Sequence, residues 1–131
     1  MDSDLRGRFD RLLDEVLAEL PDDLRARLEE VPLVVEDLPS RALLDELGVA
    51  RGRDLCGLYT GVPLTERSVW QSGVLPDKLR IFRRGIVDAA RSARGRLSDA
   101  DLKRQIRITV LHEMGHHFGL DEGELRRLGY E

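Results

Sequence analysis

The hydrophobic positions near the N-terminus follow helical spacing. Between residues 4 and 20 the apolar side chains recur every three or four positions, which predicts a helix. Ser3 or Asp4 is expected to cap it, and Pro21 is expected to end it. A second short helix is expected over residues 22–30. Together these helices make residues 1–29 an N-terminal helical segment.

Three later segments have the composition of strands, namely residues 32–36, 56–62 and 78–83. Apolar and basic residues alternate in the last of them, as in a strand with one buried face. Further helices are expected over four segments: 41–47 between Ser40 and Gly48, 85–94, 99–118, and a short one from Glu122. Residues 64–77 are expected to form a loop. The order ααβαββααα predicts an α+β fold, with a small mixed sheet packed on the 99–118 helix.

The composition fits one soluble domain over residues 1–131. Hydrophobic residues make up 41% of the chain and charged residues 35%, so a core can form under a strongly solvated surface. No segment approaches the roughly 20 apolar residues that span a bilayer, and the charged N-terminus lacks the apolar region of a signal peptide. Cys56 is the only cysteine, which rules out an intrachain disulfide. We therefore expect a cytoplasmic protein without membrane contact.

Charge is distributed unevenly along the chain. Residues 1–55 carry 8 basic and 15 acidic side chains, whereas residues 56–110 carry 11 basic and 5 acidic ones. The basic region could contact nucleic acid, but its arginines are not interleaved with aromatic residues and match no nucleic-acid-reading motif. We expect a solvated arginine-rich surface and no nucleic-acid partner.

The three histidines of the chain lie within six residues, at positions 112, 116 and 117. On a helix His112 and His116 project from one face, one turn apart, which is the spacing at which zinc takes two imidazole ligands. Glu113 points about a quarter-turn away, where its carboxylate can reach a water molecule beside the metal and act as a general base. This pattern predicts a zinc site with one ion.

A third protein ligand is expected from the turn after the helix, because few residues follow it. Gly119 can adopt positive φ and reverse the chain, which brings Asp121, Glu122 and Glu124 back toward the metal. Asp121 and Glu124 have the spacing of a capping box, so both are expected to bind backbone amides. Glu122 is therefore the preferred third ligand, with Asp121 as the alternative.

The spacing His112-Glu113-x-x-His116-x-x-Gly119-x-x-Glu122 resembles the extended zincin motif. Three stretches resemble the small bacterial zincin-like metallopeptidases, a family with a minimal zincin fold: VLHEMGHHFGL (110–120), GLYTGVPLT (57–65) and LPDKLRIFR (75–83). The resemblance covers about residues 30–125, the expected motif-bearing core. The family usually has Asp where this chain has Glu122. The methionine turn of the broader metzincins has no counterpart downstream of the motif.

The resemblance implies a zinc-dependent peptidase that acts on a peptide or protein substrate, with Glu113 as its catalytic base. The alternative function is a zinc-stabilised module that binds a peptide or protein without cleaving it. Strand 56–62 is expected at the sheet edge, where it could bind an extended peptide. His117 is expected to make a hydrogen bond, either in the core or to a residue that supports the metal ligands. Tyr59 is expected to pack with a solvated hydroxyl, and Cys56 to be a buried free thiol.

Overall fold

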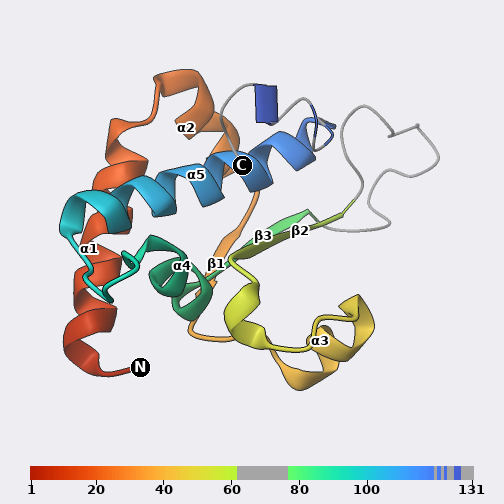
Figure 1. Ribbon diagram of the computed structural model, residues 1–131. Helices are drawn as coiled ribbons and strands as arrows, with labels where there is room; N and C mark the ends of the chain where they lie inside the picture. The colour runs from red at the N-terminus through yellow and green to blue at the C-terminus, as the bar shows by residue number, and fades with distance from the viewer. Residues whose placement is uncertain (62–76, 120, 122, 124–125, 128–131) are drawn as a thin grey trace.

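Three short strands, covered on one face by a long helix, form the centre of the molecule (Figure 1). The computed structural model describes residues 1–61, 77–119, 121, 123, 126 and 127. The elements are α1 (Ser3–Glu19), α2 (Asp22–Glu29), β1 (Leu33–Glu36), α3 (Arg41–Leu47), the 3₁₀ turn η1 (Gly52–Asp54), β2 (Gly57–Thr60), β3 (Lys78–Phe82), α4 (Arg83–Ala90) and α5 (Asp99–His117). Their order confirms the predicted α+β architecture.

The sequence signals for helix ends were mostly right. Ser40 caps α3 by accepting a hydrogen bond from the Leu43 N–H at 3.1 Å, and Gly48 ends the helix with φ +71°. The cap of α1 was predicted wrongly at Ser3 or Asp4, because Asp2 accepts the Leu5 N–H at 2.8 Å and the helix begins one residue later.

Helix α4 was predicted over residues 85–94, but it begins at Arg83 and ends at Ala90. It starts early because β3 runs directly into it, with Phe82 as the N-cap residue. It ends early because residues 92–96 form a tight turn, in which the Ser92 N–H donates to the Arg96 carbonyl at 2.8 Å and Gly95 has φ +81°. A sequence pattern that lacks a clear stop signal before Gly95 does not reveal this turn.

The sheet is mixed and has the order β1-β3-β2. β1 pairs parallel with β3, and β2 pairs antiparallel with it. The strands predicted at 32–36 and 78–83 are confirmed. The strand predicted at 56–62 is shorter, because β2 ends at Thr60 and Gly61 turns the chain with φ +138°. Most of the predicted loop 64–77 and of the helix predicted from Glu122 lies outside the described residues.

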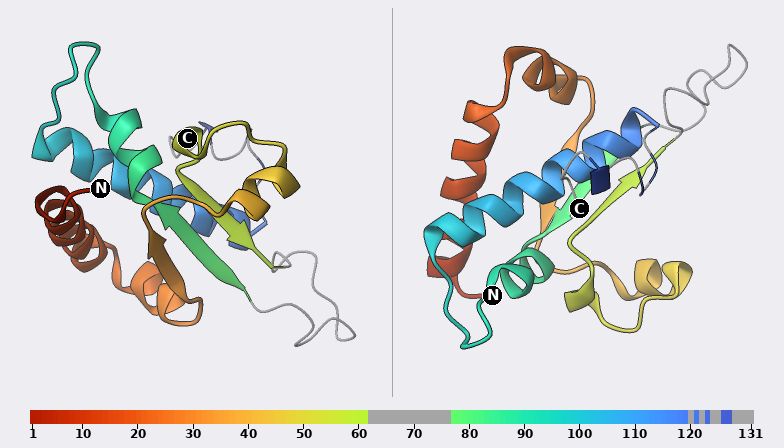
Figure 2. Two further views of the ribbon diagram at one scale, coloured as in Figure 1. Left: turned by 90° about the horizontal axis from the view of Figure 1, so that it is seen from below. Right: turned by 45° about the horizontal axis from the view of Figure 1, so that its top comes forward.

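The core lies between the sheet and helices α1, α4 and α5. Register places Leu79 and Ile81 of β3 on the same face as Gly57 and Tyr59 of β2, and this face packs on α5. The buried core residues are Phe9, Leu12, Leu13, Val16, Val31, Leu79, Ile81, Ile86, Val87, Leu102, Ile106, Val110 and Met114. Two further views show α5 crossing this face, with α1 against its N-terminal half (Figure 2). Among the described helices, none combines the length and the apolarity needed to cross a membrane.

The uneven charge distribution reflects pairing inside the molecule. Arg83 is only 13% exposed and binds Asp10 at 3.0 Å and Asp37 at 2.9 Å, both from the acidic N-terminal region. The hydrogen bond from Arg6, together with Arg83, lowers the pKa of Asp37. Lys103 and Arg107 of α5 bind Glu19 of α1 in the same way, at 2.7 and 2.9 Å. The expectation of a wholly solvated arginine surface is therefore wrong for Arg83.

Candidate metal centre

Helix α5 forms where the sequence provides both a cap and a continuous apolar stripe. Ser98 accepts the Asp101 N–H at 3.0 Å and starts the helix. Leu102, Ile106, Val110 and Met114 then recur every four residues and are at most 4% exposed, so they hold one side of α5 in the core. The helix ends at His117, and Gly119 follows with φ +84°.

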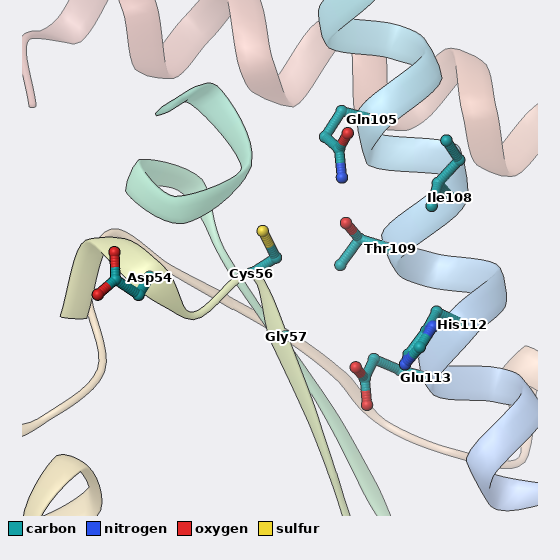
Figure 3. Close-up of a pocket in the computed structure, with 8 residues that line it drawn as sticks. All are labelled: Asp54, Cys56, Gly57, Gln105, Ile108, Thr109, His112 and Glu113. Carbon is teal, nitrogen blue, oxygen red and sulfur yellow. The ribbon is translucent and has the colours of Figure 1, made fainter. Parts of the chain in front are cut away.

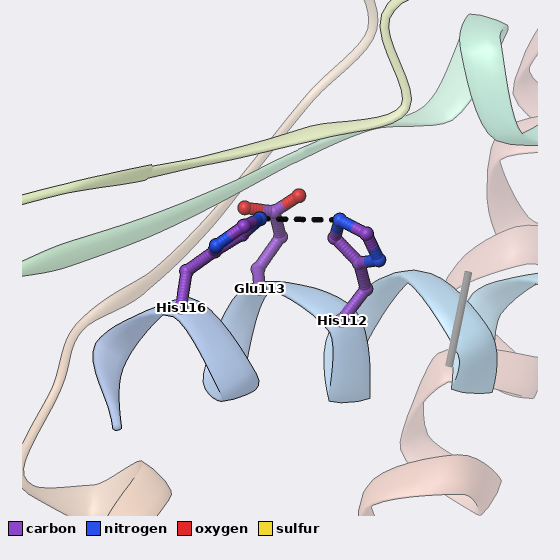
Figure 4. Close-up of side chains that lie close together, drawn as sticks. All are labelled: His112, Glu113 and His116. Carbon is purple, nitrogen blue, oxygen red and sulfur yellow. Dashed lines mark hydrogen bonds between the residues drawn. The ribbon is translucent and has the colours of Figure 1, made fainter. Parts of the chain in front are cut away.

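His112 and His116 lie together on α5, as their spacing predicted. Their Nε2 atoms are 3.2 Å apart, and both side chains are partly buried. Figure 4 shows the two rings projecting from the helix toward the strands, with Glu113 between them. Ligand atoms of these three residues all lie within 4.8 Å of one another. We refer to His112, Glu113 and His116 as the candidate metal cluster.

Glu113 is the most deeply buried member of this cluster, at 8% exposure. It lies under the start of β2, at Gly57. A Cβ atom at that position would come within 3.0 Å of Glu113 Cγ and of Thr109 Cγ2, and within 3.1 Å of the Arg80 carbonyl oxygen. Because glycine has no Cβ, β2 can approach α5 closely and hold the Glu113 side chain in place.

The geometry of the candidate metal cluster fits a zinc ion. Two nitrogens bound to tetrahedral zinc at about 2.0–2.1 Å lie roughly 3.3 Å apart, close to the 3.2 Å between the Nε2 atoms of His112 and His116. Without a metal, one ring can donate a hydrogen bond to the other across the same distance. Two imidazoles and a neighbouring carboxylate are also the donor types that zinc prefers.

The predicted third ligand, Glu122, lies outside the described residues, as does Glu124. Asp121, the alternative, is described and is exposed. The positive φ of Gly119 agrees with the predicted chain reversal after α5. The structure thus brings together three of the four predicted site residues, and the choice between Glu122 and Asp121 stays a prediction.

A pocket of about 220 Å³ adjoins the candidate metal cluster (Figure 3). Its walls are Asp54, Cys56 and Gly57 on one side and residues of α5 on the other: Gln105, Ile108, Thr109, His112 and Glu113. Gln105, Ile108 and Thr109 were not predicted as part of the site. They lie seven, four and three residues before His112, and this spacing was the available signal, because it places them on the histidine face of the helix.

Cys56 is a free thiol that lines this pocket. Burial raises the pKa of Cys56, and the negative charges of Glu113 and then Asp88 raise it further. A raised pKa keeps the thiol protonated near neutral pH, which makes it a weak nucleophile. The expected free thiol is therefore supported, whereas the expected burial is only partial.

A second polar cluster lies beside the first and was not predicted. The Tyr59 hydroxyl donates to Asp77 Oδ1 at 2.8 Å, and His117 Nδ1 lies 3.3 Å from Asp77 Oδ2. The side chains of His117 and Asp77 are 7% and 10% exposed. We call these three residues the Asp77 cluster. The core hydrogen bond expected of His117 is consistent with this contact. The hydroxyl of Tyr59, expected to be solvated, donates to a carboxylate whose side chain is 10% exposed.

Comparison with known families places this site in context. Residues 28–130 match the family described as zincin-like metallopeptidase. Because the match covers most of the chain, the protein belongs to the zincin-like metallopeptidase family, as its resemblance indicated. The family implies a zinc cofactor, and the His112–Glu113–His116 group could bind it. A comparison with curated proteins gives no match.

Proposed function

We propose that the protein is a zinc-dependent peptidase in which His112, His116 and Glu122 hold one zinc ion and Glu113 is the general base. The observation that carries this proposal is the 3.2 Å separation of the two histidine Nε2 atoms, beside a carboxylate that is buried under the sheet edge. Membership of a metallopeptidase family supports the same conclusion.

The chemistry divides between the metal and the chain. A zinc ion bound at these residues supplies Lewis acidity, which polarises a peptide carbonyl and makes water an effective nucleophile near neutral pH. Glu113 accepts the proton of the attacking water on its carboxylate and transfers it to the leaving amine nitrogen. Gly57 contributes by packing against Glu113, since a restrained carboxylate stays oriented toward the reacting atoms.

The peptide would bind along β2. This strand is an edge of the three-stranded sheet, with β3 on one side. An extended peptide that adds to the other side would form main-chain hydrogen bonds with Gly57–Thr60. It would then pass above the candidate metal cluster, because Gly57 lies directly over Glu113.

Elemental analysis of protein purified without chelator tests the metal part of the proposal. We expect about one zinc per chain in the wild type. Glu122→Ala should lose most of this zinc, whereas Asp121→Ala should retain it. A wild-type content below a tenth of one zinc per chain, unchanged in His112→Ala, would contradict the site. If Glu122→Ala retains zinc and Asp121→Ala loses it, Asp121 and not Glu122 is the third ligand.

A peptide-library screen with wild type and Glu113→Gln side by side tests catalysis. The substitution keeps the size of the side chain and removes the base, so we expect the zinc content to stay and cleavage to fall by about 10²–10⁴-fold. Equal cleavage by both proteins would assign the activity elsewhere. If neither protein cleaves while both bind zinc, the alternative of a non-catalytic peptide-binding module is favoured.

A further inference from the structure

The start of β2 is held between two helices at positions where each contact involves a glycine. Gly57 packs on α5, and the two residues before it, Leu55 and Cys56, lie against Gly85 of α4. A Cβ atom at Gly85 would overlap the carbonyl oxygen of Leu55 and lie 2.7 Å from its carbonyl carbon and 3.2 Å from Cys56 Cα. Because these are backbone atoms, no side-chain rotation can relieve the contact.

Helix α4 is the fixed partner in this contact. Ile86 and Val87, which follow Gly85, are 0% exposed and anchor the helix in the core. Glycine inside a helix is less favourable than alanine, so Gly85 serves the close approach of the two chains and not the helix. Residues 51–56 are exposed or half-buried. A side chain added at position 85 would therefore displace the segment before β2, and not α4.

An ion pair ties the same segment to α4. Arg53 of η1 binds Asp88 at 2.8 Å, and Asp88 lies three residues after Gly85, on the same side of the helix. The segment before β2 is thus attached to α4 by a side-chain contact and by a backbone contact.

The attached segment leads directly to the candidate metal cluster. Gly57 follows Cys56, and a Cβ atom at Gly57 would come within 3.0 Å of Glu113 Cγ. Successive residues of a strand are about 3.3 Å apart, so one peptide unit separates the contact with α4 from the contact with Glu113. A displacement of about 1 Å at a reacting group can lower a rate by about 100-fold.

We propose that Gly85 is a positioning residue for peptide cleavage. By admitting the backbone of Leu55 and Cys56, it sets the place of the β2 start over Glu113. It acts on the Glu113 carboxylate through Gly57 and is not itself part of the candidate metal cluster. This assignment rests on the proposed peptidase function, and a measurement on metal-free protein separates the two ideas.

Amide hydrogen exchange in metal-free protein is the first experiment, because two amides of β3 report different sides of the sheet. The Phe82 N–H donates to the Cys56 carbonyl at 2.8 Å and reports the segment before β2. The Leu79 N–H donates to the Pro32 carbonyl at 2.9 Å and reports the β1 side. The ratio of the two exchange rates distinguishes a local displacement from a general loss of stability.

In Gly85→Ala we expect exchange at Phe82 to rise about tenfold relative to Leu79. The control is Ile86→Val, which removes a methyl group from the same helix but adds no atom beside Leu55. It should destabilise the protein and raise both exchange rates equally. A Phe82-to-Leu79 ratio in Gly85→Ala that equals the wild-type ratio would overturn the proposal.

Peptide cleavage by the zinc-loaded protein is the second experiment. Gly85→Ala should keep about one zinc per chain, since the ligands are unchanged, and should lower kcat by about ten- to a hundredfold with a smaller change in KM. Ile86→Val should stay within about twofold of the wild type, as should Gly7→Ala, where a Cβ atom meets nothing within 4 Å.

The two measurements together distinguish the possible failures. Altered exchange at Phe82 with unchanged kcat in Gly85→Ala would overturn the positioning role and leave the peptidase function in place. Altered exchange in a protein whose wild type cleaves no peptide would support the placement of β2 by Gly85 and contradict the proposed function.

Asp88→Ala is a milder variant that tests the proposal if Gly85→Ala does not fold. It removes the ion pair to Arg53, so the Phe82-to-Leu79 exchange ratio should rise, and kcat should fall, by about two- to threefold. The matched control is Arg25→Ala, which removes an ion pair to Asp22 within α2 and should change neither quantity. Identical behaviour of these two variants would overturn the proposal.

Discussion

The second half of α5 carries two polar clusters that differ in the origin of their partners. In the candidate metal cluster, all three side chains come from α5 itself, and two imidazole nitrogens face each other at 3.2 Å. In the Asp77 cluster the side chains come from three places, namely β2, the residue before β3, and the end of α5. The adjacent residues His116 and His117 therefore have different surroundings.

The difference distinguishes a histidine that supports the fold from one suited to a ligand. His117 is 6% exposed and has a carboxylate of the same chain beside its Nδ1 atom, so the fold itself supplies a complementary partner. His112 and His116 are half-buried and present like groups to each other, and His112 also lines the pocket. Two like imidazole nitrogens at this distance are complementary to a shared cation.

The largest expected effect is the difference in zinc content between two single variants, His116→Ala and His117→Ala. We expect His116→Ala to reduce zinc from about one per chain to less than a tenth, because only one imidazole ligand remains. His117→Ala should keep most of the zinc but unfold at lower urea concentration, since it leaves Asp77 buried without its histidine partner. Elemental analysis and urea titration measure the two effects. Zinc loss in His117→Ala at full stability would reverse the assignment of the two clusters.

Gly57, in β2, and Gly61, just after it, allow the candidate metal cluster and the Asp77 cluster to be compared from the sheet side. A Cβ at Gly57 would press on Glu113, whereas a Cβ at Gly61 would lie 2.3 Å from Asp77 Oδ1 in a backbone with φ +138°. Alanine at either position should destabilise the protein by about 1–3 kcal/mol through crowding. At a temperature where both variants are folded, only Gly57→Ala should lower the rate of peptide cleavage. An equal loss of activity in Gly61→Ala would show that the two clusters act as one site.

The candidate metal cluster was predictable because its geometry is local. Residues four apart on a helix share a face whatever surrounds them, so His112 and His116 could be placed from the sequence. The same holds for helix α3, where Ser40 and Gly48 act within one turn of the helix ends. The sheet strands were also found, since their alternating or apolar composition is contained in four or five residues.

The Asp77 cluster was not predictable because its contacts are distant in sequence. Tyr59 and His117 are separated by 58 positions, and Asp77 has no neighbour pattern that indicates a buried carboxylate. The pocket beside the candidate metal cluster was predictable only in part. Its α5 wall follows from helical spacing, but the wall formed by Cys56 and Gly57 depends on how closely β2 packs on the helix. The ion pairs of Arg83 were hidden for the same reason, since Asp10 lies on another helix.

Removal of a single hydroxyl tests the structural role of the Asp77 cluster. Tyr59→Phe deletes the hydrogen bond from the hydroxyl to Asp77 Oδ1 and retains the ring. We expect the free energy of unfolding to fall by about 1 kcal/mol, the usual contribution of one such bond. Zinc content and peptide cleavage should stay close to wild type. A tenfold loss of cleavage with unchanged stability would instead give Tyr59 a role in the reaction.

The smallest expected effect is a shift in the pKa of Cys56 when the negative charge of Glu113 is removed. Alkylation depends on the thiolate, so the pH at half-maximal rate reports the pKa of Cys56. Burial raises this pKa first and Glu113 next, and both favour the protonated thiol. In metal-free protein the midpoint should lie above that of the unfolded chain. Glu113→Gln removes the nearby negative charge but leaves the burial of Cys56. The pH midpoint of alkylation should therefore fall, but stay above that of the unfolded chain.

Two control variants make this shift specific to the candidate metal cluster. Glu46→Gln removes a carboxylate from an exposed position on α3, and Tyr59→Phe alters the Asp77 cluster without changing a charge. Neither should move the midpoint of Cys56. If Glu113→Gln also leaves the midpoint of Cys56 unchanged, the carboxylate of Glu113 does not influence the thiol. The proposed role of Glu113 as a general base then loses support. A shift in Glu113→Gln alone would show that the buried carboxylate carries its negative charge in the metal-free protein, the form that a general base requires.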